Sequence, residues 1–138
     1  MIGLAVLAIL AALAMPSYLD AIRKNRRSEG IAALSQLQQS QERWRANAAT
    51  YTTALTTASP NGLGLPGTTE KGFYTVAIGA ADATSYTATA SAVSGSSQAN
   101  DRRCKVLAVR MTGGNIGYGA GATSGTLDWA DPNRCWAR

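Results

Sequence analysis

The chain has 138 residues, enough for one compact domain with a modest core and too few for a multidomain enzyme. Charged residues make up only 15% of it, against about a quarter in average soluble proteins, and the net charge is +5. The chain has no histidine and only two cysteines, so it lacks the commonest general base and cannot build a four-ligand zinc site from Cys and His. This composition disfavours hydrolases and zinc proteins.

The N-terminal segment is apolar on all sides. Its first fifteen residues, MIGLAVLAILAALAM, contain no polar side chain. Three interpretations compete: a secretory signal peptide, a core helix of a soluble domain, and a membrane or filament helix. A signal peptide opens with basic residues and closes on a small-residue cleavage site, and a core helix needs a polar face for solvent. Because the segment has neither pattern, we favour the membrane or filament helix, although its helical length of about 22 Å is short for a bilayer.

After Pro16 the pattern becomes amphipathic, with apolar residues at helical spacings between Arg, Gln, Ser and Glu. Because a proline removes a backbone donor and clashes with the preceding turn, we expect a kink or an unwound stretch around residues 9–15. Four bases follow the apolar block directly: Arg23, Lys24, Arg26 and Arg27. They indicate either a charged collar beside a membrane or a helix bundle, or an ordinary solvated helix face.

The segment LAILAALAMPSYLDAIRKNRRSEGIAAL resembles the N-terminal helix of bacterial type IV pilins. The shared features are an apolar helix, a Pro followed by Ser-Tyr, a basic cluster and an Ala-rich amphipathic continuation. The next stretch, SQLQQSQERWRANAATYTT, resembles the exit of that family's helix toward its head domain. The resemblance is close over roughly the first 54 residues. The later stretch GFYTVAIG more loosely resembles the first head strand of minor pilins and DNA-uptake receptor pilins.

The start of the sequence departs from the family pattern. Mature pilins begin with an N-methylated aromatic residue and carry a Glu within the first few residues, and neither is present here. Met1 would align a few residues after that Glu. Either a short apolar stretch, with the methylated residue, precedes this sequence, or the chain is a truncated product, and we favour the first.

The resemblance implies an α+β fold, the type IV pilin fold. In that fold a long N-terminal helix, with its apolar half protruding and its amphipathic half packed, lies on a small antiparallel β-sheet head with a disulfide-bounded C-terminal loop. We assign residues 1–22 to the hydrophobic filament-core or transmembrane helix, 23–54 to the amphipathic half and 55–138 to the globular head. Residues 55–71, dense in Thr, Gly and Pro, are predicted to be the connecting loop, and the disulfide-bounded region is placed at 104–135.

Three segments of the head have strand patterns. Period-two alternation and β-branched residues predict antiparallel strands at 72–79, 85–93 and 104–111. The glycine-rich stretch 112–125 is expected to be a loop held from outside. Trp129 and Trp136 are expected to cover the disulfide and the sheet edge.

The two cysteines, Cys104 and Cys135, resemble the pair that bounds the C-terminal region of pilins. Two cysteines in a small exported chain commonly pair, and a free buried cysteine is the alternative. A bond would close a loop of about 31 residues and contribute roughly 3.5 kcal/mol. It would also imply an oxidising compartment outside the cytoplasm.

The resemblance implies a structural subunit of a type IV pilus, a helix-packed filament at the bacterial cell surface that serves adhesion, twitching motility or DNA uptake. Such a subunit resides in the inner membrane before assembly, meets the pilus assembly machinery and other pilins, and self-associates into a helical homopolymer of the extracellular filament. Small side chains let its apolar helices approach closely. The residues expected to pack in the filament core are Gly3, Leu4, Ala5, Leu7, Ala8, Leu10, Ala11, Ala12, Ala14, Pro16 and Tyr18.

The alternative function is a minor pilin that acts as an extracellular DNA-binding receptor for natural transformation. In pilins of that branch, a basic stripe on the head binds DNA, with Lys and Arg contacting phosphates. In an assembly subunit the same charges would meet acids of neighbouring subunits or face solvent. The candidate DNA contacts are Arg102, Arg103, Lys105, Arg110 and Arg134, with Arg138 beside them.

A second alternative is a type II secretion pseudopilin, in which Asp128 and Asp131, with Asn133 nearby, would form a calcium loop. Two carboxylates are few for a hard cation, so turn-forming Asp residues are the simpler interpretation. The sequence has no acid–base pair, nucleophile elbow, P-loop or dinucleotide motif. We therefore expect no enzyme, no cofactor and no small-molecule substrate.

Overall fold

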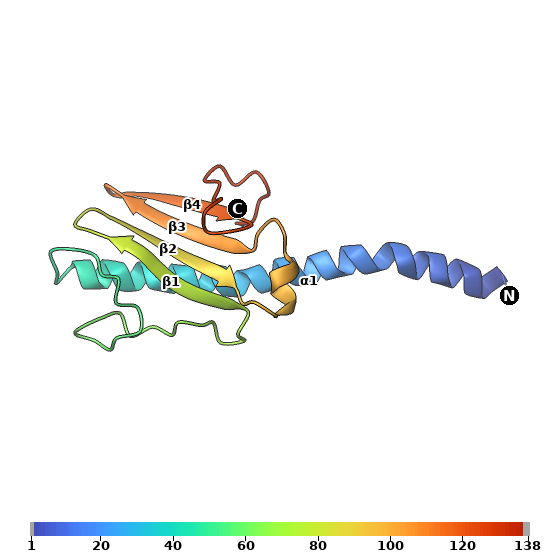
Figure 1. The fold of residues 1–138 in the computed structure, drawn as a ribbon, viewed down its shortest axis with the longest axis horizontal. Coiled ribbons are helices and arrows are strands. Elements are labelled where there is room, and N and C mark those ends of the chain that lie inside the picture. Colours follow the sequence, from blue (N-terminus) through green and yellow to red (C-terminus); the bar gives the residue numbers. More distant parts are fainter. Residues whose placement is uncertain (1, 137–138) are drawn as a thin grey trace.

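The computed structural model describes residues 2–136, which form one long helix lying along an antiparallel sheet (Figure 1). A short 3-10 helix, η1 (Ser97–Asn100), lies between the second and third strands. The bounds of the main elements are α1 Ile2–Arg45, β1 Tyr74–Ala81, β2 Ser85–Ala92, β3 Val106–Thr112 and β4 Asn115–Gly121. The predicted α+β type IV pilin fold is confirmed.

The two halves of α1 have different surroundings. Residues 2–21 are exposed and extend beyond the head, whereas Gly30, Leu34 and Leu37 are buried against the sheet (Figure 1). A side chain at Gly30 would meet the Tyr74 ring 3.2 Å from its Cβ, so this glycine lets the helix approach β1 closely. Within the described residues, α1 is the one helix long and apolar enough to cross a membrane.

The helix continues through Pro16 without an unwound stretch, so that part of the prediction for residues 9–15 is wrong. A single proline removes only one hydrogen bond of the helix, and a gentle bend of the protruding half accommodates it (Figure 1). At the other end α1 stops at Arg45, short of the predicted boundary at 54. There the Trp44 indole donates to the Thr50 carbonyl at 3.1 Å, because the chain turns back toward the sheet.

The four strands form a meander in the order β1-β2-β3-β4, with every neighbouring pair antiparallel. In β2 the burial alternates strictly: Tyr86, Ala88, Ala90 and Ala92 are buried, and the residues between them are half-buried. The buried residues belong to the same core cluster as Leu34 and Leu37 of α1. The small alanines therefore form the inner face of the sheet, which accommodates the helix.

The prediction that residues 112–125 are a loop is wrong, because Asn115–Gly121 form β4 and pair with β3. Glycine has a low intrinsic preference for strands, so another contact must favour this one. Trp129 lies over the strand: a Cβ on Gly119 would come within 2.8 Å of the indole, and one on Gly117 within 3.6 Å. The glycines make room for a flat aromatic ring on the outer face of the sheet.

The disulfide between Cys104 and Cys135 is present, and both cysteines are buried. It ties the segment before β3 to the segment after β4. Asp131 holds the same region, because its two carboxylate oxygens accept the backbone N–H groups of Cys135 at 2.9 Å and Trp136 at 3.0 Å. The Trp136 indole donates to the Gly119 carbonyl at 2.8 Å, which anchors the C-terminal segment to β4.

A buried polar cluster joins the head to the middle of α1. Arg27 makes a bidentate ion pair with Asp101, with its Nε 2.6 Å and its Nη2 3.0 Å from the two carboxylate oxygens. Gln98 of η1 donates to the Tyr74 hydroxyl at 2.8 Å and to the backbone carbonyl of Arg23 at 3.2 Å. Burial raises the pKa of Tyr74 to about 12. The cluster fixes the head at one height on the helix.

Candidate nucleic-acid interface

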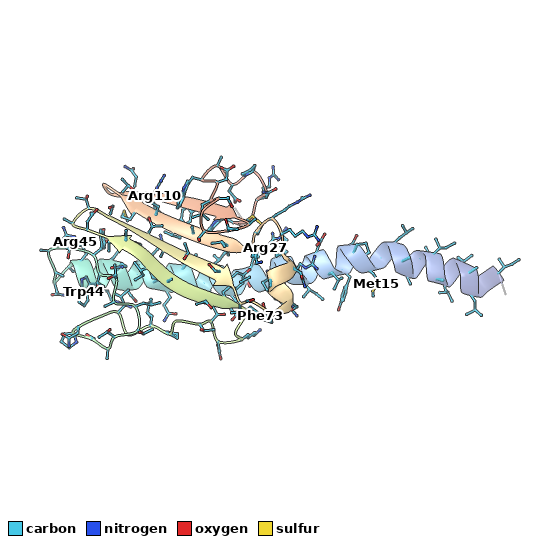
Figure 2. All side chains as sticks on the ribbon, in the orientation of Figure 1. Met15, Arg27, Trp44, Arg45, Phe73 and Arg110 are labelled. Atoms are coloured by element: carbon cyan, nitrogen blue, oxygen red, sulfur yellow. A yellow bond between two sulfur atoms is a disulfide. The ribbon has the colours of Figure 1, made fainter. Side chains whose placement is uncertain are left out.

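Arg110 is a base on a strand of the sheet whose side chain stacks on an aromatic ring. It lies on β3, exposed, and its guanidinium carbon stacks 4.3 Å from the centre of the Trp129 ring. In the sheet register it lies between Thr87 of β2 and Gly117 of β4. Figure 2 places Arg110 on the half of the head that contains β3 and β4, toward the end away from the protruding helix. The stack holds a charged group on a rigid, flat support.

Two further bases flank the disulfide. Lys105 follows Cys104 and Arg134 precedes Cys135, and the Cα atoms of the two cysteines are 5.5 Å apart. Lys105 and Arg110 are separated by roughly 16 Å along the strand, at about 3.3 Å per residue. Because positions 105 and 110 are five apart, strand alternation puts their side chains on opposite faces of the sheet: Arg110 lies on the outer face with Trp129, whereas Lys105 pairs with the inward-facing Ala92. We call Lys105, Arg110 and Arg134 the β3 bases.

The other two candidate DNA contacts lie elsewhere. Arg102 and Arg103 line a hollow of about 620 Å³ at the base of the head, together with Arg23, Lys24 and Arg27 of α1. Lys105, Arg110 and Arg134 do not line that hollow. The structure thus divides the five predicted DNA contacts into two groups, and Arg138 lies outside the described residues.

The platform beneath Arg110 was not predicted from the sequence. Gly117, Gly119 and Gly121 alternate with larger residues in β4, and this period of two was the available signal. Glycines at alternate strand positions leave one face open for an aromatic ring, which the fold supplies from Trp129.

The aspartates of the C-terminal segment stabilise turns by accepting backbone N–H groups. Asp131 caps Cys135 and Trp136, and the Oδ1 of Asp128 accepts the Ala130 N–H at 2.9 Å. Among residues 2–136, no three His, Cys, Asp or Glu side chains lie together as a metal site would require. The turn-forming interpretation of these residues accounts for each of these bonds.

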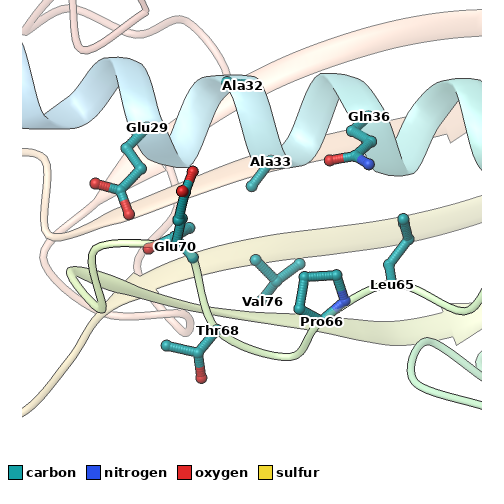
Figure 3. A pocket seen from close by; sticks show the side chains of 10 residues that line it. Glu29, Ala32, Ala33, Gln36, Leu65, Pro66, Thr68, Glu70 and Val76 are labelled. Carbon is teal, nitrogen blue, oxygen red and sulfur yellow. The ribbon is translucent and has the colours of Figure 1, made fainter.

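A smaller cavity of about 310 Å³ lies between α1 and the loop that leads into β1 (Figure 3). Its charged lining consists of Glu29 and Glu70, and it is otherwise built from small, apolar and hydroxyl side chains. The Oε1 of Glu29 accepts the backbone N–H of Lys71 at 2.9 Å, which ties the loop to the helix. Two carboxylates repel phosphate, so this cavity does not suit a nucleic acid.

The protruding apolar helix, the sheet packed on its second half and the disulfide-bounded C-terminal region together define a type IV pilin. Residues 16–108 match the family model described as type IV minor pilin ComP, DNA uptake sequence receptor. The chain belongs to this family of minor type IV pilins. Proteins of this kind are filament components rather than enzymes. Comparison with curated protein sequences finds no significant match.

Proposed function

We propose that the chain is a minor type IV pilin that acts as a DNA-uptake receptor. The family match over residues 16–108 is the observation that carries this proposal, because the family is described by that role. It favours the receptor over the abundant structural subunit that the resemblance of the N-terminal helix alone implies.

In this proposal Arg110, on the outer face of the sheet, contacts a phosphate of duplex DNA, and Lys105 and Arg134 beside the disulfide add positive charge. Phosphate contacts by Lys and Arg position a duplex and make binding depend on salt, whereas base edges are read separately. Arg110 is well suited to such a contact because Trp129 holds its guanidinium in place on the sheet.

The apolar half of α1 determines where the subunit resides before and after assembly. The helix anchors the unassembled subunit in the inner membrane and packs among other pilin helices in the extracellular filament. The assembly machinery would transfer it between these two states, and Arg110 would face solvent on the filament surface. Residues 2–21 leave the head free for ligands, because they make no part of its core.

The test is a titration of the full chain, held in uncharged detergent micelles, with labelled duplex fragments of the source genome and shuffled duplexes of equal composition. We expect binding that weakens as salt rises and that prefers some genomic fragments. Arg110→Gln should weaken binding to all duplexes and reduce the slope of log affinity against log salt by about one.

Lys71→Gln is the matched control, since Lys71 is exposed in the loop before β1, at the opposite edge of the sheet from β4. It should leave the salt slope unchanged. Absence of salt-dependent binding by the unmodified chain would overturn the receptor proposal, and mass spectrometry of sheared filaments would then show whether this chain is their main constituent.

A further inference from the structure

The hollow at the base of the head gathers a second group of bases, separate from the β3 bases. It lies where the head meets α1, beside η1 and the disulfide, in the region of Arg27 in Figure 2. Bases from two distant parts of the chain converge there: Arg23, Lys24 and Arg27 from the helix, and Arg102 and Arg103 from the loop before β3. We call these five residues the basic collar.

The collar has more positive charge than its own acids neutralise. Two carboxylates line the hollow, and each is already paired: Asp20 with Arg23 at 3.1 Å and Asp101 with Arg27 at 2.6 Å. The remaining three bases, Lys24, Arg102 and Arg103, are exposed and have no ion-pair partner among residues 2–136. The hollow therefore presents three uncompensated positive charges to an incoming group.

The position of the collar relative to the apolar helix identifies the kind of surface it meets. The exposed apolar residues run from Ile2 to Leu19, and none is buried in the head. Lys24 follows Leu19 by about 8 Å along the helix axis, at 1.5 Å per residue. When the apolar segment lies in a bilayer, this rise puts the collar at the level of the lipid headgroups rather than in bulk solvent.

We propose that the basic collar binds the phosphate groups of anionic phospholipids while the subunit resides in the membrane. Three unpaired bases in one hollow attract a phosphate diester, and arginine donates to its oxygens in pairs. Each base near an anionic membrane surface strengthens binding by about fivefold. The Arg27–Asp101 ion pair keeps Arg102 and Arg103 beside the helix, because it joins their loop to α1.

This inference does not depend on the DNA-uptake role, since it concerns the unassembled subunit and a different set of bases. It also predicts that Arg102 and Arg103 are less accessible to DNA in the membrane-bound state. A duplex approaching the hollow would meet the membrane surface on one side and the head on the other.

The test uses the full chain reconstituted in phosphatidylcholine bilayers with trace spin-labelled lipids. The spin label reports the fraction of lipid held at the protein, for phosphatidylglycerol and for phosphatidylcholine. We expect a severalfold preference for phosphatidylglycerol that shrinks as salt rises. Arg102→Gln combined with Arg103→Gln should bring the preference close to parity, and Lys24→Gln should lower it by a smaller factor.

Arg43→Gln is the control, because Arg43 is exposed near the far end of α1, roughly 28 Å along the helix from Lys24. It should retain the preference. If Arg102→Gln with Arg103→Gln disrupts the near-ultraviolet circular dichroism of the head, Lys24→Gln, on the exposed helix surface, still decides the question. An unchanged preference in the folded collar variants would overturn the inference.

Two further measurements distinguish lipid binding at the hollow from a free-phosphate site and from DNA binding. Inorganic phosphate added at constant ionic strength should leave the preference intact, and its abolition would show a free-phosphate site instead. Duplex titration of the same variants should show unchanged DNA affinity. Loss of DNA binding with an unchanged lipid preference would assign the hollow to DNA and overturn the lipid proposal, leaving the receptor proposal standing.

Discussion

At the scale of single residues, two aspartate–arginine pairs at the base of the head offer a direct comparison of buried and exposed ion pairs. Asp101, which is 3% exposed, makes the bidentate pair with Arg27. Asp101→Ala leaves Arg27 with a half-buried, uncompensated charge, so we expect the free energy of unfolding to fall by about 3–5 kcal/mol. Urea unfolding of the full chain in micelles, followed by near-ultraviolet circular dichroism, measures the change.

The control is Asp20→Ala, which removes the partner of Arg23 in the neighbouring exposed pair. Surface pairs contribute about 0–1 kcal/mol, so this variant should unfold close to the unmodified chain. Equal losses from the two variants would contradict the view that the Arg27–Asp101 pair fixes the head on the helix.

The turn between β1 and β2 carries a pH-dependent contribution. Asp82 accepts a 2.6 Å bond from the Ser85 hydroxyl and bonds from the backbone N–H groups of Thr84 and Ser85. The Ser85 hydroxyl bond and these backbone bonds lower the pKa of Asp82 from 3.8 to about 2. Because the folded pKa is the lower one, ionised Asp82 stabilises the fold above the unfolded value of 3.8, and this stability is lost as pH falls toward 2.

Carboxyl resonances in a carbon NMR titration of the full chain in micelles test this pKa. Ser85→Ala should raise the pKa of Asp82 toward its ordinary value, because the strongest of its bonds is lost. Ser94→Ala, in the exposed turn after β2, should leave it unchanged. An Asp82 pKa near 3.8 in the unmodified chain would show that the turn bonds are absent.

At the scale of elements, β4 depends on the match between its glycines and Trp129. A methyl group on Gly119 would stand 2.8 Å from the indole, closer than carbon atoms pack, while one on Gly117 would stand at 3.6 Å, an ordinary contact. We expect Gly119→Ala to lower the free energy of unfolding by about 1–3 kcal/mol through overpacking and Gly117→Ala to change it little. Urea unfolding followed by tryptophan fluorescence measures both.

A double variant distinguishes overpacking from a general effect on the strand. Trp129→Ala removes the ring that Gly119 must accommodate, so adding Gly119→Ala to it should cost much less than in the unmodified chain. The same cost in both backgrounds would place the origin of the effect elsewhere in β4.

The sequence predicted some of these elements and missed others for physical reasons. Strands β1 to β3 show period-two or β-branched patterns, so their existence was predictable and only their ends differ by a few residues. Strand β4 was missed because glycine disfavours strands locally, and the ring that favours it belongs to a later segment. The separation of Arg102 and Arg103 from the other candidate DNA contacts could not be predicted either. It depends on the contact between Arg27 and Asp101, which are 74 residues apart in the chain.

At the scale of the whole molecule, the disulfide closes the C-terminal half of the head. Cys104 and Cys135 are 31 residues apart, and cross-linking a loop of this length restricts the unfolded chain by about 3.5 kcal/mol. Cys104→Ser with Cys135→Ser should therefore lower the melting temperature of the full chain. Since the bond also brings Arg134 toward Lys105, the variant should weaken DNA binding, and an unchanged melting temperature would contradict the stabilising role.

The two halves of the molecule have separable roles, and one substitution tests this. Ala8 lies on the exposed apolar half of α1, among residues that contact no part of the head core. Ala8→Arg puts a charge into the helix at a cost of about 2.5–3.5 kcal/mol in a bilayer and blocks close packing with other pilin helices. We expect the variant to be absent from sheared filaments while its near-ultraviolet circular dichroism in micelles stays unchanged.

Ala77→Arg, on exposed β1, adds the same charge to the head and should enter filaments normally. Normal incorporation of the Ala8→Arg variant would show that the apolar half of α1 is not the segment that packs with other pilins.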